Sequence, residues 1–238
     1  MYGSHLQNIA NNGFTVVDDV FAEDEIRSVL HEISKADANK STFRKSAGLF
    51  AIRQFLKEIP AAKSLIFNAK LKATIAALFG DGYFVVKSIY FDKPEESNWF
   101  VAWHQDLTIS VDKRTDLPGF GPWTTKQDQF GVQPPLNILE DNFTIRIHLD
   151  NADAGNGALK VVPGSHLKGI YRPETIDWDV ETETTCEVKA GGIMVMRPLL
   201  LHASSRTTNH KPRKVIHIEF SRAGLPVETS WAELGKIQ

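Results

Sequence analysis

His104 and Asp106 stand two positions apart in the segment WHQDLTIS. On a β-strand, side chains two residues apart project to the same side, so these two groups are able to hold one metal ion. A set of two histidines and one carboxylate leaves positions open on Fe(II) for a chelating oxoacid and for O2. The pair therefore predicts part of a non-haem iron site whose third ligand lies elsewhere in the chain.

Spacing alone leaves that third ligand open. The remaining histidines are His5, His31, His148, His166, His202, His210 and His217. A second pair of the same pattern, His148 and Asp150, also competes with the first, since a lone pair of this kind often occurs by chance. His217, between two isoleucines, is typical of a hydrogen-bonded core residue.

The segment after His202 offers a second kind of group. Arg213 follows eleven residues later, at the start of an expected strand, and Ser204 lies between them. An arginine beside a metal can bind a carboxylate through two parallel hydrogen bonds, and the serine hydroxyl can assist. In isolation, Arg213 would be an ordinary surface charge.

Hydrophobic periodicity predicts the elements that position these residues. A short strand is expected at 13–17, and helices are expected from residue 23 and over 61–79. Residues 108–140 show no period and several prolines and glycines, which predicts a long loop or lid. Further strands are expected at 84–91, 99–103, 143–149, 158–162, 185–188, 192–196 and 215–220. Helices followed by many short strands predict an α+β, mainly β fold with a double-stranded β-helix, or cupin-like jelly roll.

Length and composition restrict the other possibilities. We expect one domain over residues 1–238, with a helical flank at 1–82 and the jelly-roll core at 83–222. The formal charge of -2 and the lack of a basic run argue against nucleic acid as a partner. One cysteine and the absence of a long apolar run predict a cytoplasmic protein outside the membrane. Composition leaves the oligomeric state open.

Four segments together resemble the phytanoyl-CoA dioxygenase (PhyH) family of Fe(II)- and 2-oxoglutarate-dependent oxygenases. They are GFTVVDDVFAEDEI near the N-terminus, WHQDLTIS, NGALKVVPGSHLKG, and the stretch from His202 to Arg213. The resemblance covers nearly the whole chain. It implies hydroxylation of a small molecule with Fe(II), 2-oxoglutarate and O2, and release of succinate and CO2.

The resemblance also implies roles for individual residues. His104, Asp106 and His202 match the metal ligands, Arg213 matches the residue that holds the far carboxylate of 2-oxoglutarate, and Ser204 matches its helper hydroxyl. Gln105 matches a side chain near the cosubstrate. His148 directly precedes the Asn-Gly and PGSH segment, so the resemblance implies a pocket residue there.

The sequence departs from the family at Arg146, where an aromatic residue is expected. Arg146 and an inward-pointing Lys87 would make the pocket cationic, either for a substrate carboxylate or other anion or for the cosubstrate itself. His148, and Trp123 and Gln133 from the lid, are candidates for substrate contact.

Two other functions use the same residues. A cupin-like protein would bind a metal or small ligand without turnover, but Arg213 and Ser204 argue for a cosubstrate. A zinc hydrolase would need a general base next to the metal, and no motif supplies one. Asp106 argues against a halogenase, because those related enzymes replace this carboxylate with a small residue.

Overall fold

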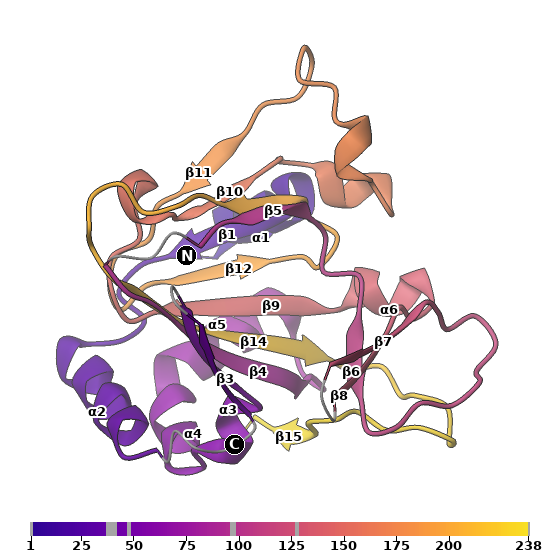
Figure 1. Cartoon of the computed structure of the whole chain (residues 1–238), viewed down its shortest axis with the longest axis horizontal. Coiled ribbons are helices and arrows are strands. Elements are labelled where there is room, and N and C mark those ends of the chain that lie inside the picture. The colour runs from indigo at the N-terminus through magenta and orange to yellow at the C-terminus, as the bar shows by residue number, and fades with distance from the viewer. Residues whose placement is uncertain (1, 37–41, 47–48, 96–98, 127–128, 238) are drawn as a thin grey trace.

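Two β-sheets face each other in the computed structural model of this chain (Figure 1). The structure describes residues 2–36, 42–46, 49–95, 99–126 and 129–237. Antiparallel pairing joins the neighbouring strands of both sheets. The arrangement is that of a jelly roll with flanking helices, as the sequence predicts.

The larger sheet carries most of the hydrogen-bonded pairs. Its strands are, in spatial order, β1 (Phe14–Val17), β12 (Ile193–Met196), β9 (Phe143–His148), β14 (Arg213–Ser221), β4 (Phe84–Lys93), β3 (Leu49–Arg53) and β2 (Phe43–Ser46), with β15 (Gly235–Lys236) on β4. Because side chains alternate along a strand, Ile145 and Ile147 of β9 face the helices whereas Arg146 faces the smaller sheet.

The smaller sheet lies opposite the larger sheet. Its strands are β11 (Thr184–Cys186), β10 (Leu159–Val161), β13 (His202–Ser204) and β5 (Val101–His104). Three short 3-10 helices adjoin it, η1 (Ala154–Asn156), η2 (Ser165–Lys168) and η3 (Pro173–Thr175). In the register of β13 against β5, His202 lies directly opposite His104.

Helices cover the outer face of the larger sheet. They are α1 (Gly3–Asn12), α2 (Glu23–Ser34), α3 (Phe55–Glu58), α4 (Ala61–Ile66) and α5 (Ala69–Phe79). Their apolar side chains, such as Ile66 and Leu71, are fully buried against Phe143, Ile145 and Phe220 of the sheet. This core holds the sheet rigid from behind, so the opposite face can carry polar groups.

The predicted helix over 61–79 is two helices. Asn68 separates them, with its side chain accepting a hydrogen bond from the backbone N–H of Leu71 at 2.8 Å. The same amide donates to the carbonyl of Val20 and to Glu25. Asn68 therefore lies between α4 and α5 and caps the N-terminus of α5. Its hydrogen bond to Glu25 also connects this junction to α2.

The expected helical flank is only partly helical. The strands β1, β2 and β3 all lie within residues 14–53 and pair with the larger sheet. These strands are four or five residues long, so their pattern is too short to separate from a loop, and α1 was not expected at all. Since this flank contributes strands to the main sheet, we propose that flank and core form one domain.

Residues 108–140 are not the long lid loop that the sequence predicts. They form a three-stranded sheet, in the order β6 (Ile109–Val111), β8 (Gln129–Val132) and β7 (Trp123–Lys126), followed by α6 (Leu136–Asp141). Ile109, Val111 and Val132 are buried with Trp231 from the C-terminal segment. The strands have three or four residues and their apolar partner is distant in sequence, so no local period reveals them.

Among the described residues, no helix has both the length and the apolar character needed to cross a lipid bilayer.

Replacement of Asn68 by Ala is expected to lower the free energy of unfolding by about 1–2 kcal/mol, because it removes the N-terminal cap of α5 and two further hydrogen bonds. Urea denaturation measures the change. Lys72→Ala, at an exposed position of the same helix, serves as the control and should leave the unfolding midpoint nearly unchanged. Equal midpoints for both variants would show that the cap contributes nothing.

Candidate functional site

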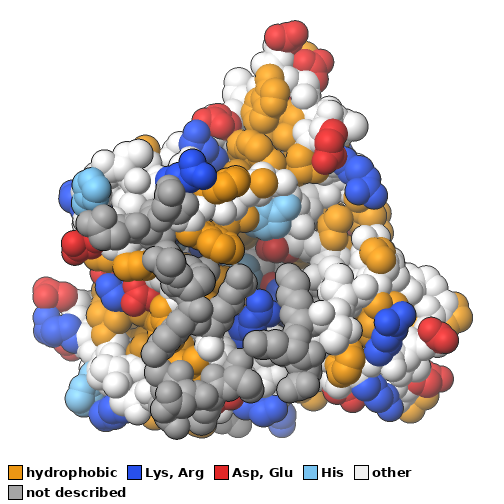
Figure 2. All heavy atoms as spheres, viewed as in Figure 1, with side chains coloured by type: hydrophobic (Ala, Val, Ile, Leu, Met, Phe, Trp, Pro, Cys, Tyr) orange, Lys and Arg blue, Asp and Glu red, His pale blue; other side chains and the backbone are white. Residues whose placement is uncertain are grey.

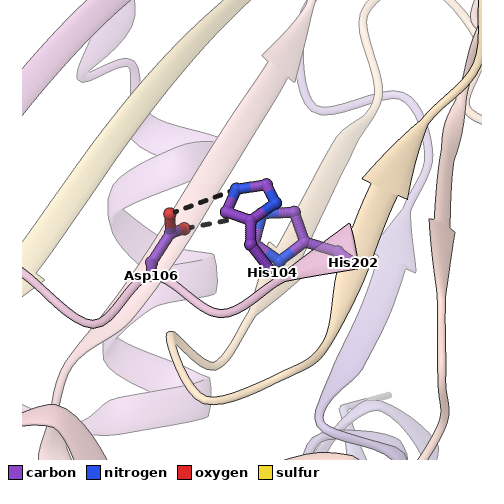
Figure 3. A group of neighbouring side chains, drawn as sticks. All are labelled: His104, Asp106 and His202. Atoms are coloured by element: carbon purple, nitrogen blue, oxygen red, sulfur yellow. Dashed lines mark ion pairs between the residues drawn. The ribbon is translucent and has the colours of Figure 1, made fainter. Parts of the chain in front are cut away.

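Three side chains converge where β5 ends and β13 begins (Figure 3). Nε2 of His104 lies 3.9 Å from one carboxylate oxygen of Asp106, and Nε2 of His202 lies 3.8 Å from the other. All three ligand atoms lie within 4.8 Å of one another. The separations are too long for hydrogen bonds, and they leave a space among three donors that suits a metal ion.

The backbone orients both imidazoles. Nδ1 of His104 lies 2.8 Å from the carbonyl of Ala102, and Nδ1 of His202 lies 2.9 Å from the carbonyl of Leu200. A carbonyl only accepts, so each Nδ1 carries the proton and each Nε2 presents a lone pair to the cluster. This is the tautomer that a metal requires of a histidine.

Charge in the cluster also suits a cation. Burial would raise the pKa of Asp106, but electrostatic interaction with the imidazoles of His202 and His217 and with the ammonium group of Lys87 outweighs it and holds the pKa below its usual value. Burial lowers the pKa of His202 to about 4, so its imidazole is neutral near pH 7. The Oδ2 atom of Asp106 is buried and has no hydrogen-bond partner among the described residues. A buried carboxylate oxygen in that condition fits metal coordination.

The second His-x-Asp pair does not form a site. β9 ends at His148, so Asp150 leaves the strand face that Arg146 and His148 share. The carboxylate of Asp150 instead accepts hydrogen bonds from the backbone and side chain of Lys214. His148 and Asp150 therefore do not compete with His104 and Asp106 as a ligand pair among the described residues.

A second group of metal-binding residue types lies next to the first. Oxygen and nitrogen atoms of Asp106, His217 and Glu219 also lie within 4.8 Å of one another. However, Glu219 already contacts Nζ of Lys87 at 2.7 Å and Nε2 of His217 at 3.1 Å. The ammonium group of Lys87 neutralises this carboxylate, so the His104, Asp106 and His202 cluster is the better metal site.

A cavity of about 240 Å³ opens beside the cluster. In the space-filling view, His and Lys or Arg side chains show at the hollowed centre of the face (Figure 2). Its charged lining residues are Arg53, Lys87, Lys93, Asp106, Arg146 and Arg213. Five of these six carry positive charge, so the cavity favours anionic ligands.

The guanidinium group of Arg213 has hydrogen-bond donors available to a carboxylate. Its Nη2 atom donates to the hydroxyl of Ser204 at 3.3 Å, while its Nε and Nη1 atoms are buried without a partner among the described residues. Burial and the nearby charge of Arg146 lower the pKa of Arg213 to about 9, which still leaves it protonated at pH 7. A buried guanidinium with two unused donors is the arrangement that a carboxylate satisfies.

Arg146 and Lys87 both line the cavity, as the sequence suggested. Arg146 donates to Nδ1 of His217 at 3.2 Å, and its Nε atom is buried without a described partner. Lys87 is paired with Glu219, which raises the pKa of Lys87 against the opposing effect of burial. Arg146 therefore keeps donor capacity toward the cavity, whereas the charge of Lys87 is largely compensated.

Gln105 is not among the residues that line the cavity. Its amide nitrogen donates to the carbonyls of Leu199 and Gly169, and its oxygen accepts from the backbone N–H of Tyr171. Strand alternation turns this side chain away from the face that His104 and Asp106 share. Gln105 instead ties the metal-binding segment to residues 169–171.

The three residues expected at the substrate lie outside the described cavity lining. Trp123 packs against the apolar cluster of the three-stranded sheet. The backbone of Gln133 pairs with Gly121 and Pro122. His148 is buried, and both of its ring nitrogens are without a partner among the described residues. Burial and the charges of Arg146 and Arg213 lower its pKa.

The sequence did not single out Lys93, Arg53 or Glu219. Lys93 lies opposite Arg213 in the register of β4 with β14 and is almost fully buried. The sequence predicted this strand over 84–91, whereas β4 continues to Lys93. With the longer strand, side-chain alternation would have placed Lys93 on the same inward face as Lys87. Arg53 enters from β3, a strand that the sequence did not predict, so no signal was available for it.

A jelly roll that presents two histidines and an aspartate beside a buried arginine defines the class of non-haem iron, 2-oxoglutarate-dependent oxygenases. The family model for phytanoyl-CoA dioxygenase (PhyH) matches residues 9–215. The chain therefore belongs to the PhyH family, and it is an iron- and 2-oxoglutarate-dependent oxidoreductase. No curated protein sequence matches the chain.

Solved structures of similar fold support the architecture. The non-heme alpha ketoglutarate dependent carbocyclase SnoK from nogalamycin biosynthesis has 16% identity and a TM-score of 0.71, covering 94% of this chain and 85% of SnoK. EctD from S. alaskensis with 2-oxoglutarate and 5-hydroxyectoine has 18% identity and a TM-score of 0.71, covering 93% and 76%. HygX from Streptomyces hygroscopicus, with nickel, 2-oxoglutarate and hygromycin B, has 15% identity and a TM-score of 0.65, covering 93% and 87%. At these identities the likeness concerns the fold.

We expect Asp106→Ala and His202→Ala each to abolish stoichiometric Fe(II) binding, because two remaining ligands hold the ion weakly. His148→Ala should retain one iron per chain, since His148 belongs to neither group of possible metal ligands among the described residues. Anaerobic equilibrium dialysis with metal analysis measures the stoichiometry. Equal loss of iron from His148→Ala and Asp106→Ala would contradict the choice of ligands.

Proposed function

We propose that this enzyme hydroxylates a small-molecule substrate with Fe(II), 2-oxoglutarate and O2, and releases succinate and CO2. The observation that carries the proposal is the convergence of His104, Asp106 and His202 beside the buried Arg213. A metal site alone would suit many proteins. A metal site beside a buried guanidinium with two donors unpartnered among the described residues suits a chelating dicarboxylate.

In this proposal, His104, Asp106 and His202 hold the iron through two Nε2 atoms and one carboxylate oxygen. Bound iron supplies the oxidising chemistry that no amino-acid side chain provides. The carbonyls of Ala102 and Leu200 accept hydrogen bonds from Nδ1 of His104 and His202, and so orient both Nε2 atoms toward the metal position. It thereby leaves one face of the site free for the cosubstrate and O2.

Arg213 and Ser204 would hold the carboxylate of 2-oxoglutarate that lies away from the metal. Arg146 lines the same cavity and interacts electrostatically with both Asp106 and Arg213, so we assign it to the metal-proximal carboxylate of the cosubstrate. Lys87 would contribute through Glu219 and His217, which it holds in place, rather than as a free cation. The apolar lining residues Ile89, Phe91 and Val215 would exclude water from the reacting centre.

The substrate would carry a carboxylate or another anionic group. Five of the six charged residues that line the cavity are basic, and bound Fe(II) would add further positive charge. Because a buried uncompensated charge is costly, an anionic substrate would complete the balance. A cytoplasmic location and the lack of nucleic-acid or membrane partners stay predictions from composition.

Anaerobic titration of the Fe(II)-loaded protein with 2-oxoglutarate tests the proposal. Bidentate chelation produces a weak visible charge-transfer band, which we expect in the wild type and not in His202→Ala. Iron binding without a band would favour a jelly-roll protein that binds a metal or small ligand without turnover. Succinate formation then separates an oxygenase from a zinc hydrolase.

Arg213→Ala is expected to raise the 2-oxoglutarate concentration needed for half-saturation at least about tenfold, because hydrogen bonds to a charged group contribute roughly 1.5–3 kcal/mol. Titration of the charge-transfer band measures it. Arg222→Ala, a surface arginine paired with Asp141, is the matched control and should bind 2-oxoglutarate as the wild type does. An unchanged requirement in Arg213→Ala would move the anchor to Arg146 or Lys93.

A further inference from the structure

Residues 169–183 form an arm that leaves the smaller sheet after η2 and returns to it at β11. The arm includes η3 and projects from the rest of the molecule at the top of Figure 1. Three of its large apolar side chains are exposed, Ile170 at 42%, Trp178 at 49% and Val180 at 77%. Apolar side chains that gather on a surface mark binding sites, whereas single ones do not.

Hydrogen bonds fix the base of the arm. The amide nitrogen of Gln105 donates to the carbonyl of Gly169 at 2.9 Å, and its oxygen accepts from the N–H of Tyr171 at 2.8 Å. The hydroxyl of Tyr171 donates to the carboxylate of Glu181, which also pairs with Lys168 at 2.7 Å. These contacts join the two ends of the arm to each other and to the metal-binding segment.

A β-bulge in β5 turns Trp103 toward this arm. The register of β5 with β13 shifts by one residue between Val101 and His104, so β5 has one residue more than its partner there. A bulge of this kind redirects the side chains next to it. Val101 and His104 both line the cavity, whereas Trp103 contacts Trp178, with ring centroids 5.5 Å apart and planes tilted by 54°.

The pair formed by Trp103 and Trp178 lies beside the metal cluster. Trp103 directly precedes His104, whose side chain is 39% exposed, so the cluster is accessible on the β5 side. Figure 2 shows hydrophobic side chains that follow the arm down to the hollowed centre of the face, where His side chains are visible. A ligand that extends out of the cavity on this side would meet the tryptophan pair.

Size indicates that a substrate does extend out of the cavity. Small-molecule sites usually have volumes of about 300–1,000 Å³. The cavity, at about 240 Å³, must take a metal, 2-oxoglutarate and at least part of a substrate. Because little room is left for the substrate, much of it would lie outside the cavity.

Charge distinguishes the cavity from the arm. Most of the charged residues that line the cavity are basic. The exposed charged residues next to Trp178 are acidic, Glu174, Asp177 and Asp179. An anionic group is therefore favoured in the cavity and disfavoured on the arm, so the part of a substrate that contacts Trp178 should carry no negative charge.

We propose that Trp103 and Trp178 bind an aromatic ring of the substrate outside the cavity. The faces and edges of the two indoles favour offset-stacked or edge-to-face contact with a planar ring. The substrate class is a small molecule with an anionic group that enters the cavity and an uncharged aromatic ring at its other end. This inference rests on the proposed function, because it takes the oxidised carbon to lie at the metal cluster.

Isothermal titration calorimetry of the anaerobic Fe(II)- and 2-oxoglutarate-loaded protein tests the proposal with two probes, 6-phenylhexanoate and 6-cyclohexylhexanoate. The probes share their chain length and carbon number, and differ in the aromaticity of the ring. The phenyl probe should bind at least about threefold more tightly, because aromatic pairs gain affinity beyond the area they bury. Equal affinities, tighter binding of the cyclohexyl probe, or no binding of either would overturn the proposal.

Variants locate the effect. Trp178→Leu keeps an apolar side chain but removes the ring, so it should lower the affinity of the phenyl probe to that of the cyclohexyl probe. Trp178→Phe should retain most of the preference. Val227→Ala, at an exposed apolar residue of the C-terminal segment, is the control and should bind both probes as the wild type does.

A preference that stays at the wild-type value in Trp178→Leu would overturn the assignment to the arm. The charge-transfer band with 2-oxoglutarate should form in every variant, because the tryptophan pair lies outside the cavity. Absence of the band from the wild type would count against the proposed function instead.

Discussion

The antiparallel pairing of β13 with β5 is the constraint on which the site depends. It sets His202 opposite His104, although they are far apart in the sequence. Each imidazole is then oriented by a carbonyl of its own strand, and Asp106 is held by a hydrogen bond from its N–H to the carbonyl of Pro198. A slip of one residue in this register would turn a ligand to the opposite face of the sheet.

The rest of the cavity is built around buried positive charge. Burial lowers the pKa of Arg146 to about 10 and that of Arg213 to about 9, and both values keep the guanidinium protonated. Glu219 compensates Lys87, and His217 links Glu219 to Arg146. The rigid apolar core behind the larger sheet supports these groups at a cost in desolvation that anionic ligands would offset. The fold is thus prepared for anions before any ligand binds.

Short segments explain where prediction from the sequence was wrong. The strands of the 108–140 region and of the N-terminal flank have three to five residues, which is too few for a period to appear. Their apolar residues are buried by partners elsewhere, as Val132 is by Trp231. Gln105 differs from its neighbours His104 and Asp106 in direction, because its side chain alternates away from theirs and binds backbone groups of Gly169, Leu199 and Tyr171.

Local patterns were sufficient for the fold class and the family, and they named the three side chains that the structure brings together as a candidate metal cluster. The two-residue spacing of His104 and Asp106 follows directly from strand geometry, and motif resemblance distinguished His202 from the other histidines. The sequence placed Lys87, Arg146 and Arg213 in the pocket, but it did not reveal the other charged residues there. Arg53 and Lys93 line the cavity, and Glu219 pairs with Lys87, because β3, β4 and β14 pair in one register. Local periodicity carries no information on such long-range pairing, so these neighbours became visible only when the sheets were assembled.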